Sequence, residues 1–271
     1  MAKIMAIANQ KGGVGKTTTS VNLSASLAAI KQRVLLIDSD PQGSATVGCG
    51  VDKQAVSGSL NEVYLGTKTV AESIVVTRWG FALLPANGDL TVSEVRLLQS
   101  EKREQKLKEA LAPIVANYDF IIVDCAPSLN MLTVNALVAA NSVLVPIQCE
   151  YYALEGLTSL LSNIEKIRHS VNPNLQLEGL LRTMYDGRTR LTVEVSEQLL
   201  EYFGDKVYHT VIPRNVRVAE APSHGMPVLG YDSHSQGAVA YLALAGEVVR
   251  RISNRENAAA SEARATASAQ S

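Results

Sequence analysis

A segment near the N-terminus carries the residue types that bind phosphate. Residues 11–18 read KGGVGKTT. Glycine lets the backbone come close to a ligand and adopt dihedral angles closed to other residues, so the amide N–H groups of such a loop can point inward at phosphate oxygens. Lys16 would reach the β- and γ-phosphates of a nucleotide, and the hydroxyl of Thr17 would ligate Mg²⁺. The predicted phosphate-binding residues are Gly12, Gly13, Val14, Gly15, Lys16, Thr17 and Thr18.

The segments on either side of this loop have the patterns of a strand and a helix. Residues 4–8 are short and apolar, as expected for a strand buried on both faces. After the loop, Val21, Leu23, Leu27 and Ile30 recur at near-helical spacing. A loop in this position places an anion at the N-terminus of a helix, where unpaired N–H groups and the helix dipole favour it. A plain glycine turn is the alternative, and the order of strand, loop, lysine, hydroxyl and helix argues against it.

Two further apolar runs end in aspartate. Residues 33–37 lead into Asp38 and Asp40, within the segment DSDPQG, and residues 120–123 lead into Asp124. The carboxyl ends of parallel strands lie on the ligand side of an open α/β sheet, so we expect these carboxylates beside the phosphate loop. Asp40 is the candidate for orienting the water that attacks the γ-phosphate, and Asp38 is expected near the metal. The predicted metal-binding residues are Thr17, Asp38, Asp40 and Asp124.

The composition of the chain limits which classes of protein it can belong to. The chain has 271 residues, of which 46% are hydrophobic, and its mean hydropathy of +0.08 indicates a substantial core. No apolar run is long enough to span a bilayer and no signal peptide is evident, so we expect a cytoplasmic protein. The net charge of −1 means that DNA binding requires a local patch or the pairing of two subunits. The three cysteines show no C-x-x-C spacing, and the four histidines show no spacing that would build a metal site.

Strand and helix patterns alternate along the chain. This alternation predicts a single α/β domain, with a mostly parallel twisted sheet and helices on both faces, over residues 1–253. Residues 254–271 are rich in alanine and serine and lack an apolar stripe, so we expect a disordered tail. Further strands are predicted at residues 81–85, 141–147, 175–183 and 207–212, and helices at 91–98, 104–116, 154–169, 194–203 and 237–252.

The phosphate loop departs from the common G-x-x-x-x-G-K-[ST] pattern, because Gln10 stands at the first glycine and Lys11 precedes the glycine pair. This form, KGGxGKT, resembles the deviant Walker A motif of the ParA/MinD group of ATPases. The segments DSDPQG and FIIVDCAPS resemble further signatures of that group. Residues 213–225, PRNVRVAEAPSHG, are similar to a block of chromosomal, Soj-like ParA proteins. The resemblance covers nearly the whole chain and implies a P-loop NTPase domain that binds ATP and Mg²⁺.

The resemblance also implies a two-chain site. In this group the equivalent of Lys11 reaches across a dimer interface to the partner's nucleotide, so a homodimer closed around ATP is expected. Asp124 takes the Walker B role of holding Mg²⁺, residues 126–128 match the switch that senses the γ-phosphate, and Pro213 and Asn215 match contacts to adenine. The implied catalytic residues are Lys11, Lys16 and Asp40, and Lys11 is also counted among the nucleotide-binding residues.

The resemblance also implies DNA binding, a protein partner and a role in the cell. Soj-like ParA proteins bind DNA without sequence preference as ATP dimers, and a ParB-type centromere-binding protein stimulates hydrolysis and releases them. The implied role is chromosome or plasmid segregation by a nucleoid-associated protein. Arg188 and Arg217 match positions that contact DNA in the family, although surface arginines without a special role are common. We expect slow intrinsic ATP turnover, because the water-activating group is weak and the site is completed only in the dimer.

Three other classes share the loop. A MinD-like membrane switch needs a C-terminal amphipathic helix with a basic face, which residues after Asn254 lack. A reductase of the nitrogenase iron protein type needs cysteines that meet across the interface, and neither Cys49 nor Cys149 lies in such a motif, while Cys125 adjoins the Walker B strand. A small-molecule ligase resembling dethiobiotin synthetase remains, and Lys11 argues against it.

Overall fold

A parallel sheet forms the centre of the molecule. The structure, a computed structural model, describes residues 2–269, and within them the sheet has seven strands in the order β3-β4-β2-β5-β1-β6-β7. Neighbouring strands are parallel except β3, which is antiparallel to β4. This confirms the predicted α/β fold with a mostly parallel sheet. The strands are β1 (Lys3–Ile7), β2 (Val34–Ser39), β3 (Val75–Val76), β4 (Ala82–Leu84), β5 (Phe120–Cys125), β6 (Ser142–Gln148) and β7 (Gln176–Thr183).

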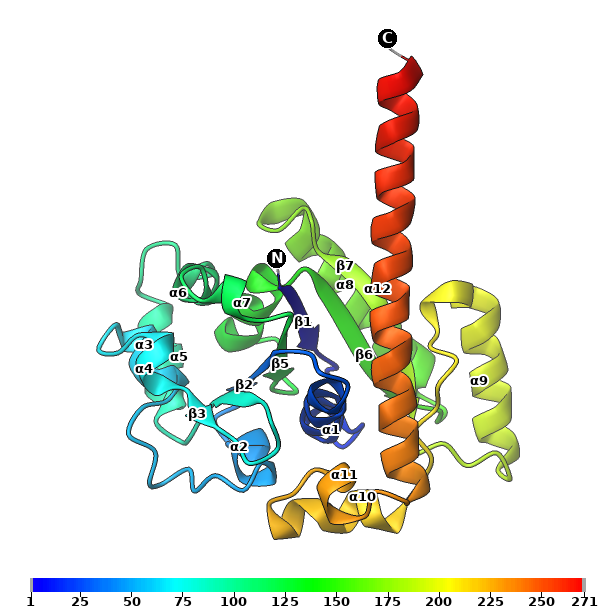
Figure 1. Ribbon diagram of the computed structural model, residues 1–271, viewed down its shortest axis with the longest axis horizontal. Helices are drawn as coiled ribbons and strands as arrows, with labels where there is room; N and C mark the ends of the chain where they lie inside the picture. The colour runs from blue at the N-terminus through cyan, green and yellow to red at the C-terminus, as the bar shows by residue number, and fades with distance from the viewer. Residues whose placement is uncertain (1, 270–271) are drawn as a thin grey trace.

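Helices surround the sheet, as Figure 1 shows. Most follow a strand and return the chain to the amino end of the next one, which is the pattern of parallel α/β folds. They are α1 (Lys16–Ala29), α2 (Ser44–Gly48), α3 (Leu60–Leu65), α4 (Val70–Ser73), α5 (Leu90–Leu97), α6 (Lys106–Leu111), α7 (Met131–Ala139), α8 (Ala153–Ser170), α9 (Arg190–Phe203), α10 (Val216–Glu220), α11 (Val228–Tyr231) and α12 (Gln236–Ala269).

The core lies in two layers, one on each face of the sheet. Successive side chains of a strand point to opposite faces. On one face Ala6 and Val123 pack with residues of α7 and α8. On the other face Met5 and Ile122 pack with residues of α1 and α12. The central strands are therefore buried on both sides, which is why their sequences are continuous apolar runs.

Residues 207–212 differ from the predicted strand. Val207 meets Leu180 of β7 at an isolated bridge, and in the described chain residues 207–212 form no strand. The carboxylate of Glu247 on α12 accepts hydrogen bonds of 2.9 and 2.9 Å from the N–H groups of His209 and Thr210. Two donors that a strand would offer to its neighbour are thus satisfied by a helix side chain instead.

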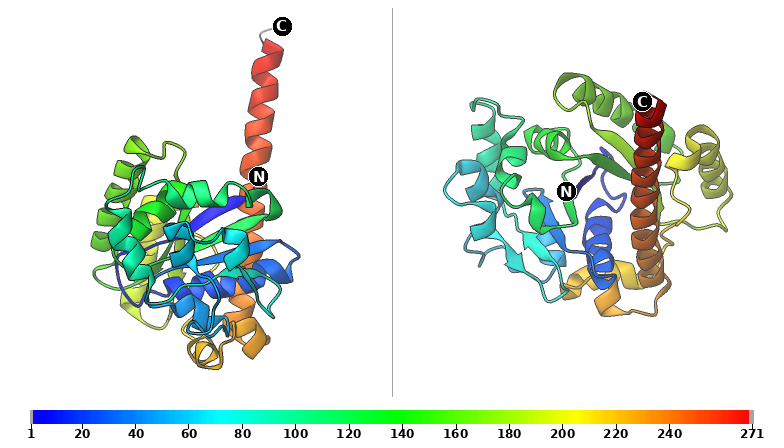
Figure 2. Two further views of the ribbon diagram at one scale, coloured as in Figure 1. Left: turned by 90° about the vertical axis from the view of Figure 1, so that its left-hand side faces the viewer. Right: turned by 45° about the horizontal axis from the view of Figure 1, so that its top comes forward.

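The last helix extends further than its apolar pattern predicts. The sequence predicts disorder from residue 254, whereas α12 continues to Ala269 and projects from the body in the left view of Figure 2. The segment is rich in alanine, the strongest helix former. Arg255 pairs with the buried Glu178, and Glu256 pairs with Lys3 at 2.6 Å. These ion pairs connect the part of α12 after residue 253 to strands β7 and β1. Residues 270 and 271 of the predicted tail lie outside the described residues.

None of the helices within residues 2–269 combines the length and apolar character needed to cross a bilayer.

Candidate functional site

The glycine-rich loop connects β1 to α1 and lines a cavity of about 480 Å³. Gly13 and Gly15 have φ angles of 74° and 87°, in the left-handed region that favours glycine. Gly15 is also the N-cap of α1, and no side chain caps the helix there. The first N–H groups of a 14-residue helix therefore face the loop without a side-chain acceptor, which suits an anion.

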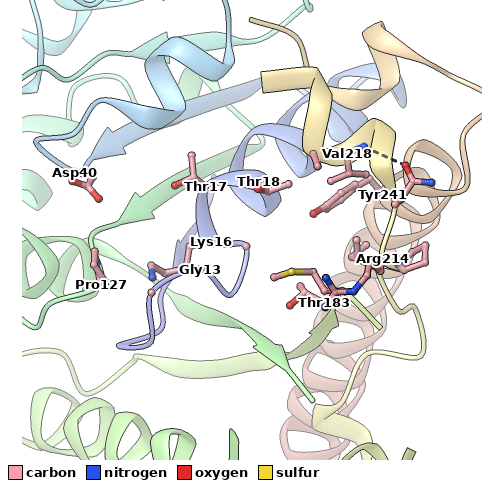
Figure 3. A pocket seen from close by; sticks show the side chains of 17 residues that line it. Gly13, Lys16, Thr17, Thr18, Asp40, Pro127, Thr183, Arg214, Val218 and Tyr241 are labelled. Atoms are coloured by element: carbon pink, nitrogen blue, oxygen red, sulfur yellow. Dashed lines mark hydrogen bonds between the residues drawn. The ribbon is translucent and has the colours of Figure 1, made fainter. Parts of the chain in front are cut away.

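The predicted phosphate-binding residues occupy the middle of this cavity. Figure 3 shows Gly13, Lys16, Thr17 and Thr18 between two groups of labelled side chains. Val14 alone of the glycine-rich loop faces inward to the core, where its carbonyl oxygen accepts a 2.8 Å hydrogen bond from the hydroxyl of Thr183. The loop residues on the cavity wall are Gly12, Gly13, Gly15, Lys16, Thr17 and Thr18.

Lys16 is a buried cation inside the loop. Its residue is 8% exposed, and its ammonium donates a 3.1 Å hydrogen bond to the carbonyl oxygen of Lys11. Burial lowers the pKa of Lys16, and the negative charge of Asp124 partly offsets that effect. An ammonium held by one carbonyl in a desolvated loop is well placed to meet phosphate oxygens.

Asp38 in β2 and Asp124 in β5 are fully buried carboxylates behind the cavity lining, to which neither belongs. Asp38 accepts hydrogen bonds from the N–H and the hydroxyl of Thr46, at 2.8 and 2.7 Å, and from the N–H of Asp40 at 3.3 Å. Asp124 accepts a 2.8 Å hydrogen bond from the hydroxyl of Ser20 on one oxygen. Its Oδ2 has no hydrogen-bond partner among the described residues.

The orphan oxygen of Asp124 fits a hard cation. Burial raises the pKa of Asp124 to about 7 and that of Asp38 to about 6, and for Asp124 the neighbouring charge of Asp38 adds to the effect. Mg²⁺ binds through one or two protein carboxylates or hydroxyls together with waters and substrate phosphates, so no dense ligand cage is needed. Among residues 2–269, no three His, Cys, Asp or Glu side chains are placed so that together they could hold a metal ion. Thr17 and Asp124 are the residues that would hold Mg²⁺.

Asp40 lies on the loop after β2 and lines the cavity. Its Oδ1 accepts a 2.9 Å hydrogen bond from the N–H of Gln42. Figure 3 places Asp40 and Pro127 at one end of the cavity. Pro127 belongs to the predicted switch segment, so the two loops after β2 and β5 meet the glycine-rich loop from the same side.

The other end of the cavity is formed by the C-terminal part of the chain. The predicted residues Pro213 and Asn215 line it, and Asn215 also caps α10 by accepting a 3.2 Å hydrogen bond from the N–H of Val218. Sequence reasoning missed several residues here. Thr183 and Met184 could have been found because they end β7, whereas Tyr241 lies in the middle of an amphipathic pattern and carries no local signal. The missed lining residues are Thr183, Met184, Ile212, Arg214, Val218, Ala219 and Tyr241.

Lys11 is placed differently from the other loop residues. The described residues that line the cavity do not include it. Its ammonium lies 2.6 Å from Oε2 of Glu150, on the connection between β6 and α8. The side chains of the pair are 40% and 44% exposed. The loop thus holds one lysine inside its own cavity and presents the other at the surface.

Arg188 and Arg217 lie on exposed segments close in sequence to Met184 and Pro213, which line the cavity. Their segments are joined by a bridge between Tyr185 and Pro213. In Figure 1 the start of α9 and helix α10 lie toward the same end of the molecule. Both arginines are engaged within the chain: Arg188 makes two 2.8 Å hydrogen bonds to Asp186, and Arg217 pairs with Glu220 at 2.9 Å and Asp232 at 3.4 Å.

Proteins of known family resemble this chain over nearly its whole length. A family model described as an AAA domain matches residues 2–177. The chain is 52% identical to sporulation initiation inhibitor protein Soj of Bacillus subtilis, covering 92% of this chain and 98% of that protein. It is 50% identical to chromosome partitioning protein ParA of Caulobacter vibrioides, covering 95% and 98%. A solved structure named cobyrinic acid a,c-diamide synthase, from Mycobacterium smegmatis with bound ATP analog and magnesium, has a TM-score of 0.82 at 38% identity, covering 93% and 96%. The chain belongs to the ParA/Soj family of partitioning P-loop ATPases.

Proposed function

We propose that this protein is an ATP-dependent switch for chromosome or plasmid segregation. Two chains close around ATP and Mg²⁺, and the ATP-bound homodimer binds DNA without sequence preference. A ParB-type partner stimulates hydrolysis, which ends the DNA-bound state. The observation that carries this proposal is the placement of the two loop lysines, with Lys16 inside its own cavity and Lys11 outside it.

The residues of one chain supply most of the phosphate site. The N–H groups of the loop and the start of α1 receive the phosphate oxygens, and Lys16 places its charge between the β- and γ-phosphates. Thr17 and the free oxygen of Asp124 hold Mg²⁺, which neutralises phosphate charge when bound. Lys11 of a second chain adds the remaining positive charge at the γ-phosphate.

Hydrolysis rests on Asp40 and is expected to be slow. Asp40 lies at the end of the cavity that Pro127 also lines, and its carboxylate accepts a hydrogen bond from the N–H of Gln42. The partly exposed Asp40 can position a water but is a weak base. Slow turnover in the free dimer leaves room for a partner to accelerate the reaction, which is the behaviour of a timed switch.

DNA binding is assigned to the surface that carries Arg188 and Arg217. Since the whole chain has a net charge of −1, attraction to phosphate must come from such a local patch. Dimerisation doubles the patch and so strengthens both binding and its dependence on salt. This role places the protein in the cytoplasm, associated with the nucleoid.

A small-molecule synthase is the second candidate, because the similar solved structure carries such a name. Such an enzyme completes its chemistry on a bound acceptor and has no need of a lysine directed away from its own cavity. A MinD-like membrane switch and an iron-protein-type reductase are less well supported. The thiols of Cys49, Cys125 and Cys149 are buried in their own chain, where a cluster shared between two chains could not reach them.

The proposal is tested by measuring DNA binding with ATP, with ADP and without nucleotide across a salt series. Binding that requires ATP, ignores DNA sequence and weakens steeply with salt is the expected result. Equal binding in all nucleotide states, or none in any, would contradict the DNA role. ATP consumption that requires an added small-molecule acid would favour the synthase instead.

A further inference from the structure

The resting position of Lys11 is set by contacts far away in the sequence. Glu150 is 139 positions from Lys11, yet their charged groups lie 2.6 Å apart. Two neighbouring contacts fix the same edge of the loop. Asn9 donates a 2.8 Å hydrogen bond to the carbonyl oxygen of Pro146 in β6, and its Oδ1 accepts one of 3.0 Å from the N–H of Lys11. The lysine is therefore held against the β6–α8 connection by both its backbone and its ammonium.

The pair lies where a second chain could reach it. Both side chains are about two-fifths exposed, and Glu150 is the ion-pair partner of Lys11 in the described part of the chain. Tyr151 and Tyr152 follow immediately, with 76% and 65% of their surface exposed and their rings 5.0 Å apart at an interplanar angle of 89°. Exposed aromatic side chains of this kind are enriched where protein chains associate. The contact surface for a second copy thus continues from the loop to the start of α8.

We propose that Glu150 is a positioning residue that retains Lys11 within its own chain until a second, ATP-loaded copy takes it. The inference rests on the proposed ATP-closed dimer. In the single chain the ammonium is neutralised by the carboxylate of Glu150. On association it exchanges that carboxylate for the phosphate oxygens of the partner's nucleotide, which carry more negative charge. The carboxylate is a competitor that dimer formation has to displace in each chain.

The size of this competition follows from the exposure of the pair. An exposed ion pair changes an equilibrium by about 1.4- to 5-fold, and a dimer opens two of them, so removing both should tighten association by about 2- to 30-fold. Salt screens exposed charges, so the effect should shrink as salt rises. A contact of this strength biases dimerisation toward the ATP-bound state without preventing it.

The test compares Glu150→Gln with Glu109→Gln. Glu109 is exposed in the first turn of α6, on a different helix, and has no ion-pair partner in the described chain, so its variant controls for the loss of one negative charge. With a non-hydrolysable ATP analogue, sedimentation equilibrium should give a tighter dimer for Glu150→Gln than for the control. In a Lys11→Ala background, the same substitution should change nothing, because the double-mutant cycle then contains no pair. Equal or weaker association of Glu150→Gln relative to the control would overturn the inference.

A second measurement separates this inference from the dimer itself. In nucleotide-free protein, acetylation of Lys11 by acetic anhydride, followed by mass spectrometry, should be faster in Glu150→Gln than in Glu109→Gln, because the carboxylate no longer masks the amine. Unchanged reactivity would overturn the role of Glu150 whatever the dimer does. If reactivity rises but wild-type protein shows no association with ATP, the proposed dimer fails, and with it the exchange of Lys11 between chains.

Discussion

Asp38 and Asp124 hold the same register position on neighbouring parallel strands, β2 and β5, but their carboxylates have different roles available to them. Thr46 and the N–H of Asp40 occupy the oxygens of Asp38. Oδ2 of Asp124 has no partner in the described residues. We infer that Asp38 shapes the loop that presents Asp40, while Asp124 is the carboxylate free to meet Mg²⁺.

Because Asp38 and Asp124 are buried together, we expect the stability of the folded protein to depend on pH. Burial, reinforced by the charge of Asp38, raises the pKa of Asp124 to about 7, so between about pH 4 and pH 7 the native state binds more protons than the unfolded state. Its contribution to the free energy of unfolding is complete at low pH and is lost as the pH rises through about 7. Without nucleotide or Mg²⁺, the stability of Asp124→Asn relative to wild type should therefore rise by about 1–3 kcal/mol between pH 5 and pH 8.

Urea unfolding of both proteins at the two pH values measures this difference. Asp38 is present in both proteins and its charge acts on Asp124, so the difference reports the titration of the pair. A difference that is the same at both pH values would show that the carboxyl group of Asp124 is not titrating. The affinity for ATP with Mg²⁺ should show the opposite trend in wild type and rise with pH, because only the ionised carboxylate binds the cation.

Lys16→Ala should remove nucleotide binding. The ammonium of Lys16 is buried in the loop and supplies the charge nearest to the β- and γ-phosphates. Loss of a desolvated charge-assisted contact should weaken ATP binding by at least about 100-fold, measured by isothermal titration calorimetry. Lys166→Ala, at an exposed position of α8, should bind as wild type does. ATP affinity retained within a few-fold in Lys16→Ala would disprove the phosphate site.

Asp40→Ala should bind ATP, lose hydrolysis and accumulate as a DNA-bound dimer. Asp40 lines the same end of the cavity as Pro127, and among the described residues no hydrogen bond joins its carboxylate to residues 11–18. Asp40→Asn keeps an acceptor for the N–H of Gln42 and should behave in the same way, which separates the chemistry from the shape of the loop. A monomeric product in both variants, measured by light scattering with ATP, would refute the assigned role.

Arg188→Glu combined with Arg217→Glu should abolish DNA retention while leaving ATP-dependent dimerisation intact. Phosphate contacts carry sequence-blind affinity, and reversing these charges adds repulsion to the loss. Arg33→Glu with Arg168→Glu is a matched control, since both arginines are exposed and paired with a carboxylate of the chain. Fluorescence anisotropy across a salt series measures both pairs. Unchanged DNA binding in the first pair would place the patch elsewhere.

The features that could be predicted from the sequence are those defined by short local motifs. The loop around Lys16, the acidic strand ends and Pro213 are each defined within a few residues, and parallel topology brings strand ends together at one edge. Contacts between distant segments could not be predicted in this way. The ion pair of Lys11 with Glu150 and the approach of Tyr241 to the cavity depend on how whole elements pack.

The two structural differences have the same origin. Residues 207–212 have a strand pattern, but Glu247 from α12 takes two of their N–H groups. Residues after 253 lack an apolar stripe, but the helix α12 continues through them. The helix propensity of alanine favours this, and Arg255 and Glu256 form ion pairs with other elements. In both cases side chains from distant elements override what the local pattern predicts.

The central claim, a site shared between two chains, is tested most directly by mixing two inactive variants. Lys11→Ala keeps its own Asp40, and Asp40→Ala keeps a Lys11 that can reach the other chain. If Lys11 acts on the partner's nucleotide, each mixed dimer holds one complete site, and an equal mixture should recover up to about a quarter of wild-type ATPase activity at saturating protein. If the mixture stays as inactive as its components, Lys11 acts within its own chain or not at all, and the shared site is contradicted.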